Sequence, residues 1–213
     1  HLMIEGIIIC CYAIDCHDAY IYIRGEYTSQ VKALQEAIDE AYEAGYLGET
    51  VNGHDFRLDV TVHRGAGAYV CGEETALLES IEGKKGQPRS KPPVPAVVGL
   101  YDCPTIINNV QTIASLPFII QEGADAYKAH GTEKSAGTHL FGISGHVEKP
   151  GMYELPLGLP LMEVLDKVAG GVWKDRQLKG VIPGGSSTPV LTAEEIPEHG
   201  AISTAIQTHC GHG

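Results

Sequence analysis

Long hydrophobic runs and positive charge are both scarce in this sequence of 213 residues. The longest apolar stretch, from Ile7 to Ile14, has eight residues, whereas a helix that spans a membrane needs roughly 18. We therefore predict no direct membrane insertion. Lys and Arg number 15 against 27 Asp and Glu, which gives a net charge of −12. This excess of negative charge argues against nucleic acid as a partner.

The spacings that mark a cysteine-based metal or redox site are also missing. Six cysteines are present, with no Cys-x-x-Cys pair and no zinc-finger spacing among them. No metal site is therefore predicted in this chain. Because no secretory signal precedes the cysteines, we expect reduced thiols in a cytoplasmic protein.

Neither of the common glycine motifs for nucleotides is complete. Gly65 and Gly67 begin a Gly-x-Gly pattern, but the Rossmann motif needs a third glycine where Val70 stands, and the Walker motif is absent. Gly65, Gly67 and Gly72 nevertheless lie between a predicted strand and a predicted helix, where backbone N–H groups can approach an anionic ligand. The structural alternative is a tight turn with close packing of helix and strand.

Segments of helical and strand periodicity alternate over residues 1–120 and predict an α/β domain with a non-Rossmann glycine turn. A Pro-rich stretch at residues 83–104 interrupts them, and paired prolines indicate an extended loop. In chain order, the predicted elements are a helix at 4–14, a strand ending at 25, a helix at 28–45, a strand at 55–63, a helix after the glycines and a helix after 109.

The rest of the sequence predicts a smaller second unit. Residues 121–137 are polar and small, which is typical of a linker, and residues 138–192 indicate a strand, a strand, a helix and a strand. This order is typical of the ubiquitin-like β-grasp fold. We interpret residues 193–213 as a divergent tail.

Polar residues crowd the helix start that follows the glycines. Cys71 to Thr75 include two adjacent acids, Glu73 and Glu74, beside a thiol. Carboxylates in a first turn are often plain partners of the helix dipole, yet this combination is unusual for capping alone. Lys91 on the stiff loop and the pair Asn108 and Asn109 add donors, and such a set suits a polar planar ring.

The same loop carries further positive charge. Lys84, Lys85 and Arg89 precede Lys91. These cations fit either the pyrophosphate of a dinucleotide or a loop exposed to solvent.

One family shares these features. The segments "GAGAYVCGEETALLES", "IEGKKGQPRSKPPVPAVVGL" and "PTIINNVQT" resemble the FMN- and NADH-binding flavoprotein subunit of respiratory complex I. The segment "IEGIIICCYAIDCHDAYIYIRGEY" and the amphipathic helix after it resemble the same family, and "HLFGISGHVEKPGMYELPLG" is similar to its β-grasp domain. The resemblance covers residues 1 to 192 and implies an FMN-binding α/β domain followed by a ubiquitin-like β-grasp domain.

The resemblance implies FMN and NAD(H) as cofactors, with NADH passing a hydride to FMN and electrons leaving singly to iron–sulfur clusters. Glu74 is then the catalytic residue nearest the nicotinamide, Lys91 lies on the approach of NADH, and the two asparagines hold the far edge of the flavin. The cofactor-binding residues it implies are Gly65, Gly67, Tyr69, Cys71, Gly72, Glu73, Glu74, Lys91, Asn108, Asn109 and Thr112.

The sequence also departs from the family pattern. It has no counterpart of the family's glycine-rich flavin-phosphate loop or of its Cys-x-x-Cys-x-x-Cys motif, so it resembles the middle of a subunit and holds no cluster ligands. Val94 stands where the family usually has a phenylalanine that stacks on the adenine.

The resemblance implies a thioredoxin-like 2Fe–2S subunit and other subunits of an electron-transfer complex as partners. It implies a cytoplasmic location, peripheral at the inner face of the cell membrane. Two alternatives stay open: the same module in an NAD-reducing hydrogenase or NAD-dependent formate dehydrogenase, or a truncated, non-catalytic fragment used only for protein contacts.

Overall fold

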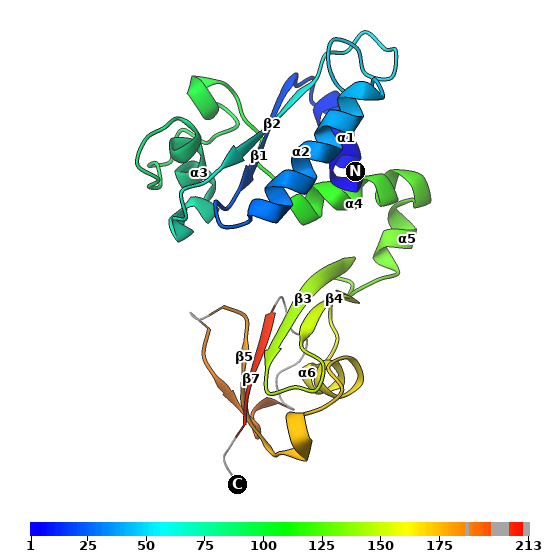
Figure 1. Cartoon of the computed structure of the whole chain (residues 1–213), viewed down its shortest axis with the longest axis vertical. Helices are drawn as coiled ribbons and strands as arrows, with labels where there is room; N and C mark the ends of the chain where they lie inside the picture. The colour runs from blue at the N-terminus through cyan, green and yellow to red at the C-terminus, as the bar shows by residue number, and fades with distance from the viewer. Residues whose placement is uncertain (186–187, 197–204, 211–213) are drawn as a thin grey trace. The chain divides into compact units, whose positions relative to one another are not determined.

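The computed structural model describes residues 1–185, 188–196 and 205–210. They fall into two compact units that meet in sequence between Pro117 and Phe118 (Figure 1). Each unit has its own hydrophobic core. Among the residues described, every helix is too short or too polar to cross a lipid bilayer.

The first unit is built on a two-stranded parallel sheet. Strand β1 (Asp18–Ile23) pairs with β2 (Asp59–Arg64). Parallel neighbours need a crossover connection, and here the crossover contains α2 (Thr28–Glu43), whereas α1 (Leu2–Ala13) precedes β1. The helices and strands that the sequence predicts for this region are confirmed.

Apolar side chains of these four elements and of the segment between α2 and β2 form the core of the first unit. Buried positions recur every three or four residues in the helices and every two in the strands. This spacing explains why the sequence predicts these helices and strands. Gly45 follows the end of α2 with φ +76°, a left-handed conformation common after helix ends. The largest buried members are Ile4, Ile7, Ile21, Ile38, Leu47, Phe56 and Leu58.

The glycine segment joins β2 to the helix that carries the predicted site. It passes through a 3₁₀ turn, η1 (Tyr69–Gly72), into α3 (Glu74–Ile81). Residues 83–99 form the extended loop expected from the prolines, which ends at the short turn η2 (Leu100–Asp102). Helix α4 (Val110–Glu122) follows, with Pro117 inside it.

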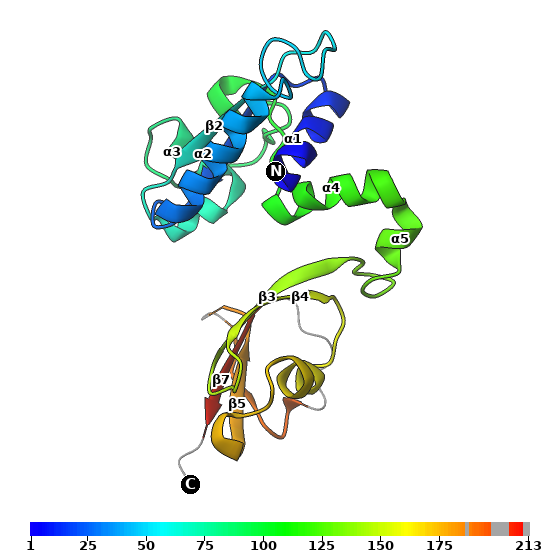
Figure 2. The same cartoon turned by 45° about the vertical axis from the view of Figure 1, so that its right-hand side comes forward.

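The second unit is a mixed five-stranded sheet in the order β4-β3-β7-β5-β6, with α6 beside it (Figure 2). Strands β3 and β4 form an antiparallel pair, and β7 runs parallel to β3 and antiparallel to β5. The strands are β3 (Thr138–Gly145), β4 (Gly151–Pro156), β5 (Leu178–Pro183), β6 (Leu191–Thr192) and β7 (Ala205–Cys210).

Short helical segments complete this unit. Helix α6 (Leu161–Glu163) continues as the π-helical turn η3 (Val164–Val168), and a 3₁₀ turn, η4 (Trp173–Asp175), precedes β5. Leu161, Leu165 and Phe141 of β3 belong to the same hydrophobic core. The predicted order of strand, strand, helix and strand over residues 138–183 is confirmed.

The structure differs from the sequence analysis at both ends of this unit. Residues 121–137, predicted as a linker, contain α5 (Ala124–Lys128), which at five residues is too short to show a helical period. Strand β7 lies within residues 193–213, which we interpreted as a tail, and it fills the place between β3 and β5. The sheet therefore extends to Cys210 instead of ending at residue 192.

Candidate functional site

The N-terminus of α3 brings predicted site residues together. The Glu73 carboxylate caps the helix: its Oε2 accepts hydrogen bonds from the Thr75 hydroxyl at 2.6 Å, the Thr75 amide at 3.0 Å and the Ala76 amide at 2.8 Å. The hydrogen bond from the Thr75 hydroxyl, with smaller contributions from the two amides, lowers the pKa of Glu73. Glu73 is therefore a fixed anion at this helix start.

Lys91 reaches this helix start from the extended loop. Its ammonium forms an ion pair with Glu74 and lies 3.8 Å from Glu73 Oε1. The hydrogen bond to Glu74 is the main cause that raises the pKa of Lys91. Two carboxylates and one ammonium thus form a partly exposed charge cluster, which we call the α3 charge cluster.

The glycines before α3 serve different purposes. A Cβ at Gly65 would lie 2.4 Å from the Tyr22 hydroxyl, and Gly67 has φ +87°. Both observations favour the structural interpretation, because close approach and positive φ each require glycine. Gly72 differs, since a Cβ there would meet no described atom within 4 Å.

The turn that contains Gly72 presents an open surface. Tyr69, at the start of the same turn, is 89% exposed. The described residues therefore leave the surface at Gly72 uncovered, next to an exposed tyrosine and the charged start of α3.

Cys71 faces the interior instead. Its side chain is buried, and a Cβ at Gly86 of the loop would lie 2.4 Å from its sulfur. The neighbouring Tyr22 hydroxyl lies 3.0 Å from the Ser80 hydroxyl. The thiol therefore packs the loop against α3 rather than lining the open surface.

The two asparagines lie directly before α4. Asn109 Oδ1 accepts a hydrogen bond of 2.8 Å from the Gln111 amide and so caps the start of α4. Asn108 lines a cavity of about 740 Å³ together with Leu77 and Leu78. In the part of the chain that the structure describes, the lining of this cavity includes no member of the α3 charge cluster. Thr112 is exposed on the first turn of α4.

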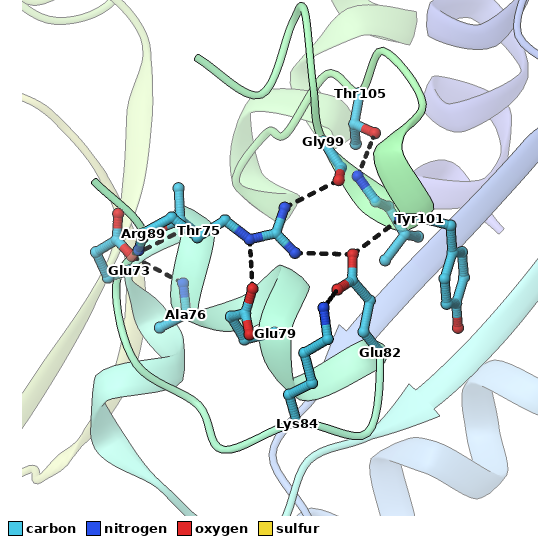
Figure 3. A network of polar contacts seen from close by, with 11 residues as sticks. Glu73, Thr75, Ala76, Glu79, Glu82, Lys84, Arg89, Gly99, Tyr101 and Thr105 are labelled. Carbon is cyan, nitrogen blue, oxygen red and sulfur yellow. Dashed lines mark hydrogen bonds and ion pairs between the residues drawn. The ribbon is translucent and has the colours of Figure 1, made fainter. Parts of the chain in front are cut away.

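Arg89 is the residue whose importance the sequence analysis missed. Its side chain does not extend into solvent but lies between Glu79 of α3, Glu82 directly after this helix and the backbone carbonyl of Gly99 (Figure 3). Lys84 donates to Glu82 at 2.8 Å. Glu79 and Glu82 lie three residues apart at the end of an amphipathic helix, and such a spacing places both acids on one side of the chain. This was the signal in the sequence that could have indicated a partner cation.

Comparison with known proteins decides the family. A family model described as the Nuo51 FMN-binding domain matches residues 1–117, more than half of the chain. The chain belongs to this family. A model of the SLBB domain matches residues 139–210, a range that includes β7. The predicted fold class, an FMN-binding α/β domain followed by a small β-grasp domain, is confirmed.

Individual relatives agree with this membership. The chain is 56% identical over 196 residues to the F subunit of NADH-quinone oxidoreductase from Mycobacterium tuberculosis, covering 92% of this chain and 44% of the relative. It is 55% identical over 194 residues to the mitochondrial NADH dehydrogenase (ubiquinone) flavoprotein 1 of Dictyostelium discoideum, covering 90% and 40%. The chain thus spans less than half the length of these relatives.

A solved structure matches the fold. A crystal structure of an NAD⁺-reducing NiFe hydrogenase superposes with a TM-score of 0.85 at 34% identity, covering 98% of this chain and 36% of that one. This identity is lower than the 56% and 55% identity to the two relatives above.

Proposed function

We propose that this chain is the FMN-binding part of a subunit that oxidises NADH and passes electrons towards iron–sulfur clusters of a respiratory NADH-quinone oxidoreductase. Membership of the Nuo51 family and the names of the relatives support this proposal. The observation that carries it is the α3 charge cluster beside the open turn at Gly72. The family resemblance assigns these residues to the flavin and to the nicotinamide side, which supports the proposal.

FMN, when bound, supplies the chemistry that links a hydride donor to one-electron carriers. The protein supplies position and charge. Glu73 Oε2 is held by three donors, which leaves Oε1 directed at Lys91. A fixed carboxylate near a ring edge orients that ring and biases its electronics without reorganising during the reaction.

Glu74 and Lys91 act at the nicotinamide side in this proposal. Each is neutralised by the other before NADH arrives. When Lys91 turns from Glu74 to a phosphate oxygen of the dinucleotide, the Glu74 carboxylate becomes available as an acceptor for a donor group of the nucleotide. The exchange involves two groups that are both about 40% exposed, so it needs no opening of the core.

The proposal extends to partners and location. The relatives carry the names of subunits of larger oxidoreductases. We infer that this chain acts next to a thioredoxin-like 2Fe–2S subunit, on the cytoplasmic side of a membrane and attached to it through other subunits.

A flavin assay tests the proposed function. The chain is expressed within the longest reading frame that encodes it, purified and mixed with FMN. We expect a yellow protein whose flavin absorption is bleached by NADH without oxygen, and a protein that takes up no FMN would contradict the proposal. Glu74→Gln is expected to retain flavin and to change the KM for NADH several-fold, whereas Glu49→Gln, at an exposed loop position, leaves both unchanged.

A further inference from the structure

Lys91 stands on a segment that has little regular structure to hold it. Between α3 and η2 the chain from Gly83 to Gly99 contains no helix or strand. Contacts of individual side chains must therefore fix where Lys91 lies. Two positions before Lys91 in the sequence, Arg89 makes such contacts.

Arg89 is bonded at both its backbone and its side chain. Its Nε donates to Glu79 Oε1 at 2.5 Å, one terminal nitrogen donates to the Gly99 carbonyl at 2.9 Å, and the other lies 2.7 Å from Glu82 Oε1. Figure 3 shows the guanidinium between these three acceptors. A planar guanidinium with acceptors on three sides is held in one orientation. The single ammonium of a lysine could not donate to the same three acceptors in this geometry.

The carboxylates that hold Arg89 are poorly exposed to water. The Glu79 side chain is 17% exposed and that of Glu82 is 6% exposed. Burial opposes ionisation of Glu82, but hydrogen bonds from Lys84, Arg89 and the Tyr101 amide outweigh burial and lower its pKa to about 2. Two poorly exposed anions are destabilising without a cation close by. Displacing Arg89 would leave Glu79 and Glu82 without this cation, so the ion pairs hold Arg89 in place.

The backbone of Arg89 connects this pair of acids to the α3 charge cluster. Its amide donates to the Thr75 hydroxyl at 2.8 Å, and that hydroxyl donates to Glu73 Oε2 at 2.6 Å. Thr75 is 1% exposed. The loop is therefore attached to α3 at the turn that presents the two acids, and Lys91 extends from the attached segment to Glu74.

We propose that Arg89 is a positioning residue for the nucleotide site: its guanidinium, held by Glu79 and Glu82, keeps the loop where Lys91 meets Glu74. The consequence for NADH rests on the proposed function, whereas the placement of Lys91 does not. Arg89 itself touches neither cofactor in this account and acts through Lys91.

The first readout is the titration of Lys91, which needs no cofactor. Lysines labelled with ¹³C at Cε are followed by NMR as pH rises, and Lys91→Arg assigns the signal. In the unchanged protein the hydrogen bond to Glu74 raises the pKa of Lys91 above the ordinary value. In Arg89→Gln we expect it to fall to that of an exposed lysine, because the released loop takes the ammonium away from Glu74. Arg89→Lys keeps the positive charge but lacks the planar guanidinium, so we expect the pKa of Lys91 to fall in this variant as well.

Lys84→Gln is the matched control. It removes a cation from the same Glu82 carboxylate but leaves every contact of Arg89 in place, so the Lys91 titration stays as in the unchanged protein. If Arg89→Gln does not fold, Glu79→Gln removes one of the two acids and shifts Lys91 in the same direction.

The second readout is NADH binding to the flavin-loaded protein. We expect Arg89→Gln to raise the Kd for NADH about tenfold with its FMN content unchanged, and Lys84→Gln to change neither. A Lys91 titration in Arg89→Gln that coincides with that of the unchanged protein would overturn the positioning role. A protein that shifts Lys91 as expected but never binds flavin would support positioning and contradict only the proposed function.

Discussion

The amide of Arg89 donates a hydrogen bond of 2.8 Å to the hydroxyl of Thr75. Thr75 lies in the first turn of α3, and Arg89 lies on the loop that follows this helix. The same hydroxyl donates to the Glu73 carboxylate. One buried oxygen thus joins the loop, the helix cap and the α3 charge cluster.

Thr75→Val tests this junction because valine keeps the shape of threonine and loses the hydroxyl. The Arg89 amide would then lack its acceptor, and Glu73 would lose its strongest donor. We expect a loss of about 1–3 kcal/mol in the free energy of unfolding, measured with urea, and a rise in the pKa of Glu73. Thr61→Val, at an exposed position of β2, should change stability by less than about 0.5 kcal/mol. Equal stabilities of the two variants would contradict the account.

The lowered pKa of Glu82 predicts how the free energy of unfolding depends on pH. Its pKa is lowered to about 2 in the folded protein from an ordinary value of 4.5, since hydrogen bonds from Lys84, Arg89 and the Tyr101 amide outweigh burial. The stability that Glu82 contributes is therefore present above about pH 5 and is lost as pH falls towards 2.

Glu82→Gln should therefore be less stable than the unchanged protein at pH 7, and the difference should shrink as pH falls. Urea unfolding at intervals from pH 7 to pH 3 measures both curves. Curves that stay parallel throughout would show that Glu82 is not an ionised partner of Arg89.

Much of the first unit was predictable because its chemistry is local. Helix α2 shows a full amphipathic period and ends before Gly45, and the alternation of Phe56, Leu58 and Val60 marks the approach to β2 and its first residues. Such patterns depend only on neighbours in the sequence. They place elements well even without knowledge of tertiary contacts.

The parts that escaped prediction depend on contacts between distant residues. Arg89 looks like an ordinary loop cation until α3 brings Glu79 and Glu82 to it. Strand β7 forms by pairing with β3 on one side and β5 on the other, both distant in the sequence. Cys71 and Gly65 are similar cases. Cys71 packs against Gly86 and Gly65 against Tyr22, and neither contact can be predicted from neighbouring residues in the sequence.

Val94 gives a prediction for affinity. The resemblance puts a phenylalanine that stacks on adenine at this position, and Val94 is 47% exposed, so a larger side chain fits without repacking the core. Aromatic stacking contributes about 0.5–1.5 kcal/mol, so Val94→Phe should tighten NADH binding roughly two- to tenfold. Val97→Phe, exposed on the same loop, should leave the Kd for NADH unchanged. An equal effect of both changes would locate the adenine elsewhere.

The central claim is that a flavin lies against the turn before α3, and Gly72 offers the most direct test. Among the residues that the structure describes, an alanine Cβ at Gly72 would meet no atom within 4 Å, and the same holds for Gly185 in the second unit. Neither glycine has a positive φ, so both alanine variants should fold with stability unchanged or raised by about 0.4–1 kcal/mol.

The decisive measurement is an FMN titration of Gly72→Ala and Gly185→Ala, followed by the quenching of flavin fluorescence. We predict that Gly72→Ala weakens FMN binding at least about tenfold, since its methyl group occupies the space of the ring, and that Gly185→Ala binds FMN like the unchanged protein. Equal affinities in two equally stable variants would contradict a flavin at this turn.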